Sequence, residues 1–325
     1  MKTGNELSSL AKTIQQFTSN NRASIAIKRF PTGMKHLDAA LGGGLSTGLY
    51  ILGAIPNLGK STFVLQIAQN LSASGVPVFF FSMEMPKNRI ASKAISRQLY
   101  LESGNAKFSS DMLLNEHETQ NPFLWEQIEK VREKVSADCQ NLYIIERSNT
   151  ICSAEDIEKI VLAQMKLLPA NQKPVVIVDY LQILSGDSNS RFVSDKSIVD
   201  ANIRVFTRLA AEQHLPVLVV SAFNRSNYRY EVSMESFKES GSIEYSADVI
   251  LGMQLSAIRK KEFDINKEKA KTPRDIDIVI LKQRYGSSGD TIPLQYFPAN
   301  DYFKEVGETN DFLTIYSHLP ERIFD

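Results

Sequence analysis

Short apolar runs alternate along most of the chain with segments in which apolar residues recur every three or four positions. The first pattern predicts strands buried on both faces, and the second predicts helices. We therefore expect strands over Leu49–Ala54, Val76–Met83, Leu142–Glu146, Pro174–Leu184 and Leu215–Phe223, and helices over Ser61–Ser72, Asn88–Leu99, Ser153–Leu168 and Ser197–His214. Strands separated by helices in this way indicate an α/β fold with a mostly parallel sheet flanked by helices.

The pattern changes after Ala247. Three predicted strands, Val249–Leu255, Ile276–Arg284 and Thr291–Phe297, follow one another with no long helix between them, which favours antiparallel strands toward the C-terminus. The segment Arg259–Arg274 carries seven basic and three acidic residues and few apolar ones, so we expect an exposed loop there. Such a run of charge is usually solvated, and contact with nucleic acid is the alternative.

A separate amphipathic helix is predicted near the N-terminus, over residues 5–18. Its apolar residues fall on one face, at Leu7, Leu10, Ile14 and Phe17. The helix either packs on its own domain or docks on a neighbouring subunit. We expect an N-terminal arm over 1–24, one main domain over 25–300 and an acidic C-terminal tail over 301–325.

Composition excludes several classes of protein. With 43% hydrophobic and 23% charged residues, the chain is not collagen-like, a coiled-coil rod or disordered. Its 37 basic and 37 acidic residues balance, so any contact with nucleic acid must come from a local patch. The sequence shows no signal peptide and no apolar stretch of membrane length, so we expect a cytoplasmic protein with no membrane partner. Cys139 and Cys152 could be bridged or reduced, and so few cysteines favour reduced thiols.

The segment Ala54–Ser61 (AIPNLGKS) fits the phosphate-loop pattern (A/G)xxxxGK(S/T) and lies between a predicted strand and a predicted helix, as that motif requires. In such a loop the backbone N–H groups point at phosphate oxygens, and Gly59 allows their close approach. Lys60 supplies a positive charge for the β- and γ-phosphates, and Ser61 supplies a hydroxyl for Mg²⁺. We expect the loop to bind a nucleotide through Ala54, Pro56, Asn57, Leu58, Gly59, Lys60, Ser61 and Thr62.

Two carboxylates are predicted at the same rim of the sheet. Asp179 ends the apolar run Val175–Asp179, and ligands of open α/β sheets bind beyond the carboxyl ends of the strands. Asp179 is therefore placed to hold Mg²⁺, directly or through water. Glu84 follows the strand Val78–Met83, where it either activates a water molecule or caps the next helix.

Taken together, these residues resemble the ATPase domain of the DnaB family of replicative hexameric helicases, which is built on a RecA-like P-loop NTPase core. The resemblance rests on five segments in the family's order: Ala54–Ser61, Phe81–Pro86, Val178–Gln182, Glu239–Glu244 with Ala247 and Asp248, and Lys282–Arg284 with Gly286. It implies a single RecA-like ATPase domain over 25–300, with ATP and Mg²⁺ as cofactors.

The resemblance also implies roles for individual residues. Glu84 becomes the catalytic base that activates water. Lys282 and Arg284 lie two residues apart on a predicted strand, so both project to one face. In relatives this pair reaches the nucleotide of the neighbouring subunit, as an arginine finger in trans. Since a monomer could not then complete its own site, a homo-oligomer follows, normally a hexamer.

Four consecutive residues, Lys238, Glu239, Ser240 and Gly241, resemble the loop with which relatives grip the backbone of single-stranded DNA inside the ring. A cation, a hydroxyl and an unhindered glycine N–H can all meet phosphate oxygens. Relatives usually carry Arg where this chain has Lys238, a change that keeps the charge and loses the fork geometry. We expect DNA binding that tolerates any base sequence and weakens with salt.

Two departures from the family pattern bear on function. Relatives usually have Gln where Ala222 stands, an amide thought to sense the γ-phosphate, and a methyl group cannot form a hydrogen bond. Only about thirty residues precede the core, so the family's N-terminal domain, which meets primase, is not expected. The helix over 5–18 resembles the linker helix that clips onto the adjacent protomer.

The function implied is an ATP-dependent helicase-type motor that translocates on single-stranded DNA, with a loader or primase as a further partner. The alternative is a RecA- or KaiC-like DNA-dependent ATPase that does not unwind DNA and acts as a loader, mediator or regulator. Ala222 favours the alternative, and the resemblance at Lys282, Arg284 and Lys238–Gly241 favours the motor.

Overall fold

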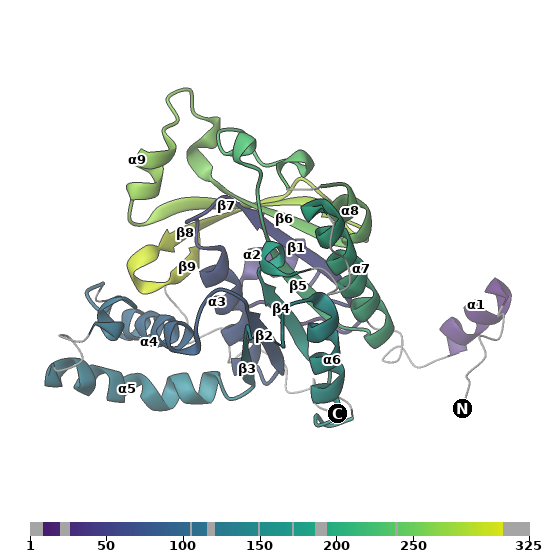
Figure 1. Ribbon diagram of the computed structural model, residues 1–325, viewed down its shortest axis with the longest axis horizontal. Coiled ribbons are helices and arrows are strands. Elements are labelled where there is room, and N and C mark those ends of the chain that lie inside the picture. The colour runs from purple at the N-terminus through teal and green to yellow at the C-terminus, as the bar shows by residue number, and fades with distance from the viewer. Residues whose placement is uncertain are drawn as a thin grey trace.

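The computed structural model describes residues 9–19, 27–104, 106–115, 121–148, 150–170, 172–185, 194–237 and 240–307. Within them, one nine-stranded sheet runs through the molecule in the order β3-β2-β4-β5-β1-β6-β7-β8-β9 (Figure 1). The strands from β3 to β6 pair in parallel, and those from β6 to β9 pair antiparallel. The predicted α/β fold, with antiparallel strands toward the C-terminus, is confirmed.

The strands are β1 Gly48–Ala54, β2 Val78–Ser82, β3 Leu142–Glu146, β4 Val175–Asp179, β5 Pro216–Ala222, β6 Val249–Leu255, β7 Arg274–Gln283, β8 Thr291–Phe297 and β9 Tyr302–Glu305. The helices are α1 Leu10–Ser19, α2 Lys35–Ala40, α3 Lys60–Ala73, α4 Lys87–Ser103, α5 Pro122–Asp138, α6 Ala154–Met165, α7 Asp195–Gln213, α8 Ser240–Ser246 and α9 Ile265–Ala270. None of the helices in the described ranges has the length and apolar content needed to cross a membrane. Neither cysteine forms a disulfide.

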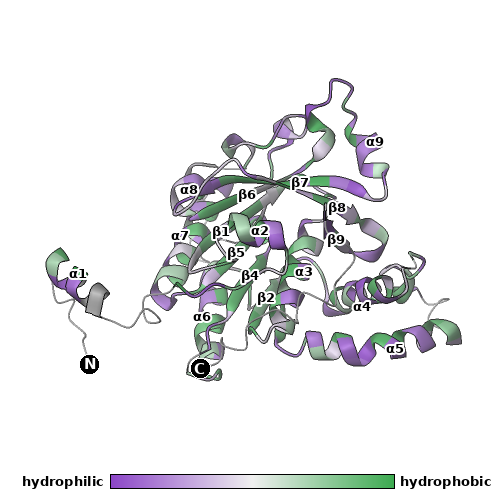
Figure 2. Cartoon of the chain, turned by 180° about the vertical axis from the view of Figure 1, so that it is seen from behind, coloured by the Kyte–Doolittle hydropathy of each residue, from purple (hydrophilic) through white to green (hydrophobic). Residues whose placement is uncertain are grey.

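The core lies along the central strands. Every residue of β1, β2, β4 and β6 is buried, which the continuous apolar runs predict for a sheet covered on both faces. Helices α3, α4 and α5 pack together on one face, and α6, α7 and α8 on the other (Figure 1). Figure 2 shows the hydrophobic residues gathered along the central strands and many hydrophilic ones on α5 and α9.

The N-terminal arm is described only in part. Residues 10–18 of the predicted helix are helical, within α1, which lies away from the sheet in both views of the molecule (Figures 1 and 2). Leu10 and Ile14 on this helix are 73% and 53% exposed. The remaining residues of the predicted helix lie outside the described residues.

Two predictions about the C-terminal third are corrected. The basic segment 259–274 is not a plain loop, because α9 forms inside it and β7 begins at its last residue. Asp264 caps α9 by accepting hydrogen bonds from the amides of Asn266 (2.8 Å) and Lys267 (3.2 Å). The sheet also continues past residue 300, where we expected the main domain to end, because β9 pairs with β8 and is largely buried.

Strand β9 is bound to two helices from the N-terminal half. The amide of Gln66 in α3 satisfies both backbone groups of Phe303, donating to its carbonyl and accepting from its N–H, each at 2.8 Å. Glu305, 2% exposed, accepts hydrogen bonds from the first amides of α2, those of His36 (3.0 Å) and Leu37 (3.1 Å). Burial raises the pKa of nearby Asp38 to about 6, and the charge of Glu305 adds to the rise. The C-terminal edge of the sheet is thus joined to α2 and α3.

Gly53, in the middle of the core, gives a test of the packing. It faces the edge-to-face pair Phe223 and Phe237, whose ring centroids lie 5.0 Å apart, and a Cβ at Gly53 would lie 2.3 Å from both rings. We predict that Gly53→Ala lowers the free energy of unfolding by about 1–3 kcal/mol, because both rings must shift. Urea denaturation measures this, with Gly241→Ala as the control, since a Cβ there meets nothing within 4 Å. Equal losses in the two variants would contradict the packing.

Candidate active site

The phosphate loop joins the end of β1 to the start of α3. Asn57 (φ 65°) and Gly59 (φ 91°) adopt left-handed backbone conformations, which turn the chain back into the helix. A Cβ at Gly59 would lie 2.8 Å from the ring of Tyr296 and 2.9 Å from that of Phe303. These two rings stack with centroids 4.3 Å apart and form an aromatic floor beneath the loop. Glycine is therefore required at position 59 both by its φ and by the floor.

Lys60 is the first residue of α3, and its side chain folds back across the loop. Its Nζ donates hydrogen bonds to the carbonyl oxygens of Ala54 (3.3 Å) and Ile55 (3.4 Å). Burial lowers the pKa of Lys60, while the carboxylates of Asp179 and Glu84 favour its charged form. These long contacts to neutral carbonyls are weaker than hydrogen bonds to phosphate oxygens would be.

Asp179 stands at the end of β4 and is 1% exposed. Both of its carboxylate oxygens are buried, and neither has a hydrogen-bond partner among the described residues. Burial raises the pKa of Asp179 to about 6. The nearby Ser61 side chain and Lys60 favour its charged form, while Glu84 opposes it.

The residues around Asp179 fit a divalent cation. A buried carboxylate without donors is costly unless a positive charge compensates it. Hard cations such as Mg²⁺ take carboxylate and hydroxyl oxygens as ligands. Asp179 and Ser61, neighbours at the rim of the sheet, are the residues that would hold such an ion.

Glu84 lies at the same rim, two residues beyond the end of β2. The last residue of that strand, Ser82, pairs with Asp179 in the register of β2 and β4. The charge of Glu84 acts on Lys60, Asp179 and Tyr180, and its side chain is exposed to solvent. The structure thus brings together Lys60, Ser61, Glu84 and Asp179, which the sequence analysis selected from three separate segments.

Two residues of the predicted loop turn away from it. Leu58 is fully buried in the core. The hydroxyl of Thr62 donates to the buried carboxylate of Asp301 (3.1 Å), which also forms an ion pair with Lys93. Leu58 and Thr62 can therefore meet a nucleotide only through their backbone.

Lys282 and Arg284, which we call the basic pair, lie at the opposite end of the strands from the phosphate loop. Lys282 pairs with Ile250 near the start of β6, whereas the phosphate loop follows the end of β1, which runs parallel to β6. A seven-residue strand is about 20 Å long, which is far beyond the reach of a side chain. The basic pair therefore does not meet the phosphate loop of its own chain.

Of the predicted DNA-contacting residues, Lys238 and Glu239 lie outside the described residues. Ser240 and Gly241 open α8, which packs against α7. The structure thus places half of this segment, at the start of a short helix whose other end contacts the basic pair.

Ala222, which replaces the usual Gln of the family pattern, is the last residue of β5 and pairs with Ala54 at the start of the phosphate loop. The amide of Gln182 reaches this point from the segment after β4. It donates to the hydroxyl of Ser221 (2.8 Å) and accepts from the N–H of Ala222 (3.1 Å). Asn224 turns elsewhere, toward the carbonyl of Phe237 (3.1 Å). An amide group therefore lies beside Ala222, but it comes from the 3₁₀ turn Leu181–Ile183 that follows β4.

The sequence and fold have well-described relatives. Residues 30–305 match the family described as DnaB-like helicase C terminal domain. The chain belongs to this family. It is 25% identical over 273 residues to a probable replicative DNA helicase of Trieres chinensis, covering 82% of this chain and 54% of that protein. It is also 25% identical over 303 residues to the replicative DNA helicase DnaB of Geobacillus stearothermophilus, covering 92% and 58%. The chain thus spans little more than half the length of these relatives.

Solved structures share the fold at low identity. One ATPase domain superposes with a TM-score of 0.73 at 20% identity, covering 92% of this chain and 99% of that domain. A DnaB-like replicative helicase gives 0.72 at 20% identity, covering 93% and 68%. A KaiC-like protein from Pyrococcus horikoshii gives 0.54 at 13% identity. These likenesses confirm the RecA-like core that the resemblance implies.

Sequence reasoning missed two basic residues that contact the phosphate loop of this DnaB-like domain. Lys269 in α9 donates to the carbonyl of Pro56, and Arg274 at the start of β7 donates to that of Asn57, each at 2.9 Å. Arg274 also lies over the ring of Tyr296, 5.7 Å from its centroid. The basic run was visible in the sequence, and the helix-capping Asp264 was the signal that part of it is ordered.

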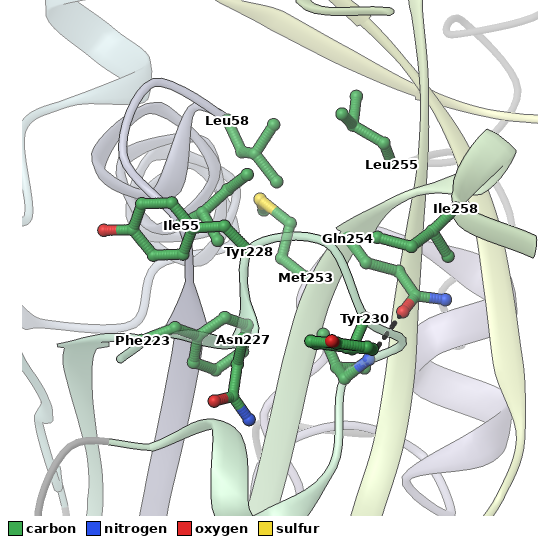
Figure 3. A pocket seen from close by; sticks show the side chains of 11 residues that line it. Ile55, Leu58, Phe223, Asn227, Tyr228, Tyr230, Met253, Gln254, Leu255 and Ile258 are labelled. Carbon is green, nitrogen blue, oxygen red and sulfur yellow. Dashed lines mark hydrogen bonds between the residues drawn. The ribbon is translucent and has the colours of Figure 1, made fainter. Parts of the chain in front are cut away.

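A pocket beside the phosphate loop was also missed. Ile55 and Leu58 from the loop line it together with Tyr228, Tyr230 and residues of β6 (Figure 3). Gln254 in its wall accepts a hydrogen bond from the N–H of Val232 (2.9 Å). The lining comes from three segments far apart in sequence, so no local sequence pattern predicts the pocket.

The buried charge of Asp179 gives a prediction about pH. Its pKa of about 6 lies above the ordinary 3.8, so folding takes up a proton between these values and the charged form costs stability above about pH 6. We predict that Asp179→Asn, without nucleotide or metal, is more stable than the wild type at pH 8 by about 1–3 kcal/mol. The difference should shrink as the pH falls through 6 toward 4, because the wild-type carboxylate becomes protonated.

Thermal denaturation of both proteins across this pH range measures the difference. Asp38, whose pKa is also raised to about 6, is present in both proteins and cancels in the comparison. A variant less stable than the wild type at pH 8 would show that the charge of Asp179 is already compensated in the folded chain.

Proposed function

We propose that this chain is the ATP-hydrolysing motor domain of a DNA helicase, which translocates on single-stranded DNA and hydrolyses ATP at the subunit interfaces of a ring. The observation that carries the proposal is that the phosphate loop and the basic pair lie at opposite ends of the strands of one sheet. Each chain offers two half-sites that cannot meet internally. A copy of the same chain can supply the missing half to its neighbour, and such head-to-tail contacts form a closed ring when the rotation between copies closes.

Each residue at the carboxyl ends of the strands has a separate role in ATP hydrolysis. The loop N–H groups and Lys60 bind the phosphates, as membership of the DnaB-like family supports. Ser61 and Asp179 hold Mg²⁺, which when bound supplies positive charge to the β- and γ-phosphate oxygens. Glu84 orients the attacking water and accepts its proton. The basic pair of the neighbouring copy stabilises the charge that develops on the γ-phosphate.

The contact with DNA is assigned to Lys238, Glu239, Ser240 and Gly241. A cation, a hydroxyl and a glycine N–H suit phosphate oxygens and carry no base preference. A neutral net charge supports contact through such a local patch rather than through the whole surface.

The assembly is proposed to be a hexamer in which α1 docks on the adjacent protomer. The exposed Leu10 and Ile14 on this helix support docking, because an amphipathic helix is stable only when its apolar face is covered. A solved relative is described together with its interactions with primase. We therefore extend the partners of this chain to a primase or a helicase loader.

Mixing two inactive variants tests the shared site. We predict that Lys60→Ala and Arg284→Ala each abolish ATP turnover alone, and that mixing them restores part of it. In the mixture some interfaces combine an intact phosphate loop with an intact basic pair. Steady-state ATPase rates with single-stranded DNA measure the recovery.

The matched control mixes Lys60→Ala with Glu84→Gln. Both changes damage the same half-site, so no intact interface can form and no activity should return. If the first mixture stays inactive while the wild type turns over ATP, the site is complete within one chain and the shared arrangement is wrong.

Ala222 favours a second candidate, a RecA- or KaiC-like DNA-dependent ATPase that does not unwind DNA. The strand that usually presents an amide beside the phosphate loop here ends in a methyl group, and the amide of Gln182 lies there instead. In the motor, Gln182 takes over the link between nucleotide and DNA, whereas in the second candidate that link is absent.

Strand displacement separates the two candidates. We predict that the wild type separates a forked DNA duplex when ATP and Mg²⁺ are present, and that Lys60→Ala does not. Release of a labelled strand is followed on a gel, with the ATPase rate measured on the same samples. DNA-stimulated turnover with no strand release would reject the motor in favour of the second candidate.

A further inference from the structure

The basic pair is held by its own chain, at the last turn of α8. The Nζ of Lys282 donates to the carbonyls of Glu244 (2.6 Å) and Ala247 (2.7 Å). The guanidinium of Arg284 donates to the carbonyl of Tyr245 (3.3 Å). Two carbonyls from the last turn of α8, and that of Ala247 just after it, therefore face two cations from the end of β7. This arrangement is favoured because helix C-termini carry partial negative charge.

Asp248 completes the site that holds the basic pair. We call this site, formed by Asp248 and the carbonyls of Glu244, Tyr245 and Ala247, the seat. The Oδ1 of Asp248 lies 3.3 Å from Nη1 of Arg284, and its backbone carbonyl accepts from the N–H of Arg284 (2.8 Å). Its Oδ2 accepts from the N–H of Leu49 (2.9 Å), and its own N–H donates to the carbonyl of Leu49 (2.8 Å). Asp248 is thus anchored by two hydrogen bonds to the backbone of Leu49, near the start of β1, and its other carboxylate oxygen holds Arg284.

The seat and the proposed role of the basic pair compete for the same donors, because both terminal nitrogens of Arg284 are engaged in the seat. Arg284 keeps 44% of its side chain exposed, so it is held at the surface and can leave. Exposed ion pairs of this kind are weak. The phosphates of a nucleoside triphosphate on the neighbouring copy carry more negative charge than the single carboxylate and the neutral carbonyls of the seat. An arginine that stabilises the γ-phosphate must therefore give up its contacts with Asp248 and α8.

We propose that Asp248 is a positioning residue that holds the basic pair in a resting seat on α8, so that engagement of the neighbour's nucleotide releases the end of this helix. The inference rests on the proposed function, in which the pair acts in trans. Because α8 begins with Ser240 and Gly241, release of its last turn alters the helix that also carries part of the proposed DNA contact. Coupling of this kind is reciprocal, so DNA bound at one end of α8 favours departure of the basic pair at the other.

Asp248→Asn tests the seat. Asn keeps an oxygen for the N–H of Leu49 and loses the charge that holds Arg284. Arg284 should then leave its seat without help, so ATP turnover in the absence of DNA should rise about 1.5- to 5-fold, the range expected for loss of an exposed ion pair. Turnover with saturating single-stranded DNA should stay the same, so the stimulation by DNA falls by the same factor.

The matched control is Asp275→Asn, which removes an exposed carboxylate from the far end of the same strand, β7. Its DNA stimulation should equal that of the wild type. If Asp248→Asn keeps the wild-type stimulation, or loses turnover equally with and without DNA, the seat has no positioning role and the inference is overturned.

Hydrogen exchange on the wild type gives a second test that needs no variant. With a non-hydrolysable ATP analogue and no DNA, the last amides of α8, including that of Ala247 bonded to the carbonyl of Ile243 (3.1 Å), should exchange faster than in the protein alone. Unchanged exchange there, in a protein that binds the analogue, would also overturn the inference.

The two levels of the proposal fail differently. A wild type that does not hydrolyse ATP, or mixed variants that do not recover activity, would reject the shared site itself. A wild type that passes both tests while Asp248→Asn behaves as Asp275→Asn leaves the shared site standing and removes only the seat.

Discussion

A negative charge buried without a hydrogen-bond donor organises the candidate site. Asp179 ends a fully buried strand, and among the described residues no group donates to either carboxylate oxygen. Burying such a charge is costly, and a fold keeps it where a cation pays that cost. Lys60 of the phosphate loop favours the charged form of Asp179, while burial and the charge of Glu84 oppose it, so the site favours the arrival of further positive charge. The proposed affinity for a metal and a nucleotide thus rests on the folding of the sheet.

The topology of the sheet then decides how many chains a site needs. Parallel strands bring the phosphate loop, Asp179 and the Glu84 segment to one edge, because their carboxyl ends all lie there. Strand β7 runs antiparallel to β6, so its C-terminal end, with the basic pair, lies at the other end of the parallel strands. A single change from parallel to antiparallel pairing therefore separates two groups of charge that suit the same ligand.

Much of this arrangement was predictable from the sequence. The central strands are continuous apolar runs, and the residues that follow them must gather at one rim, so Lys60, Ser61, Glu84 and Asp179 could be selected before the fold was known. The orientation of Thr62 could not, because its hydroxyl is claimed by Asp301, far away in sequence. The contacts of Lys269 and Arg274 with the loop were missed for the same reason, since a basic run gives no sign of which carbonyls it will meet. Patterns along the chain predict elements and edges, whereas contacts between distant segments depend on packing.

Strand β9 lies at the border of the sheet, where fraying would ordinarily be a local event. Here the same four residues provide the ring that supports Gly59, the backbone groups that bind Gln66 of α3, and the carboxylate that receives the first amides of α2. Detachment of this border would withdraw the support of the phosphate loop and uncap a helix at the same moment. The folding of β9 and the binding of a nucleotide at the phosphate loop are therefore thermodynamically coupled. A ligand bound at the loop stabilises the outermost strand of the sheet.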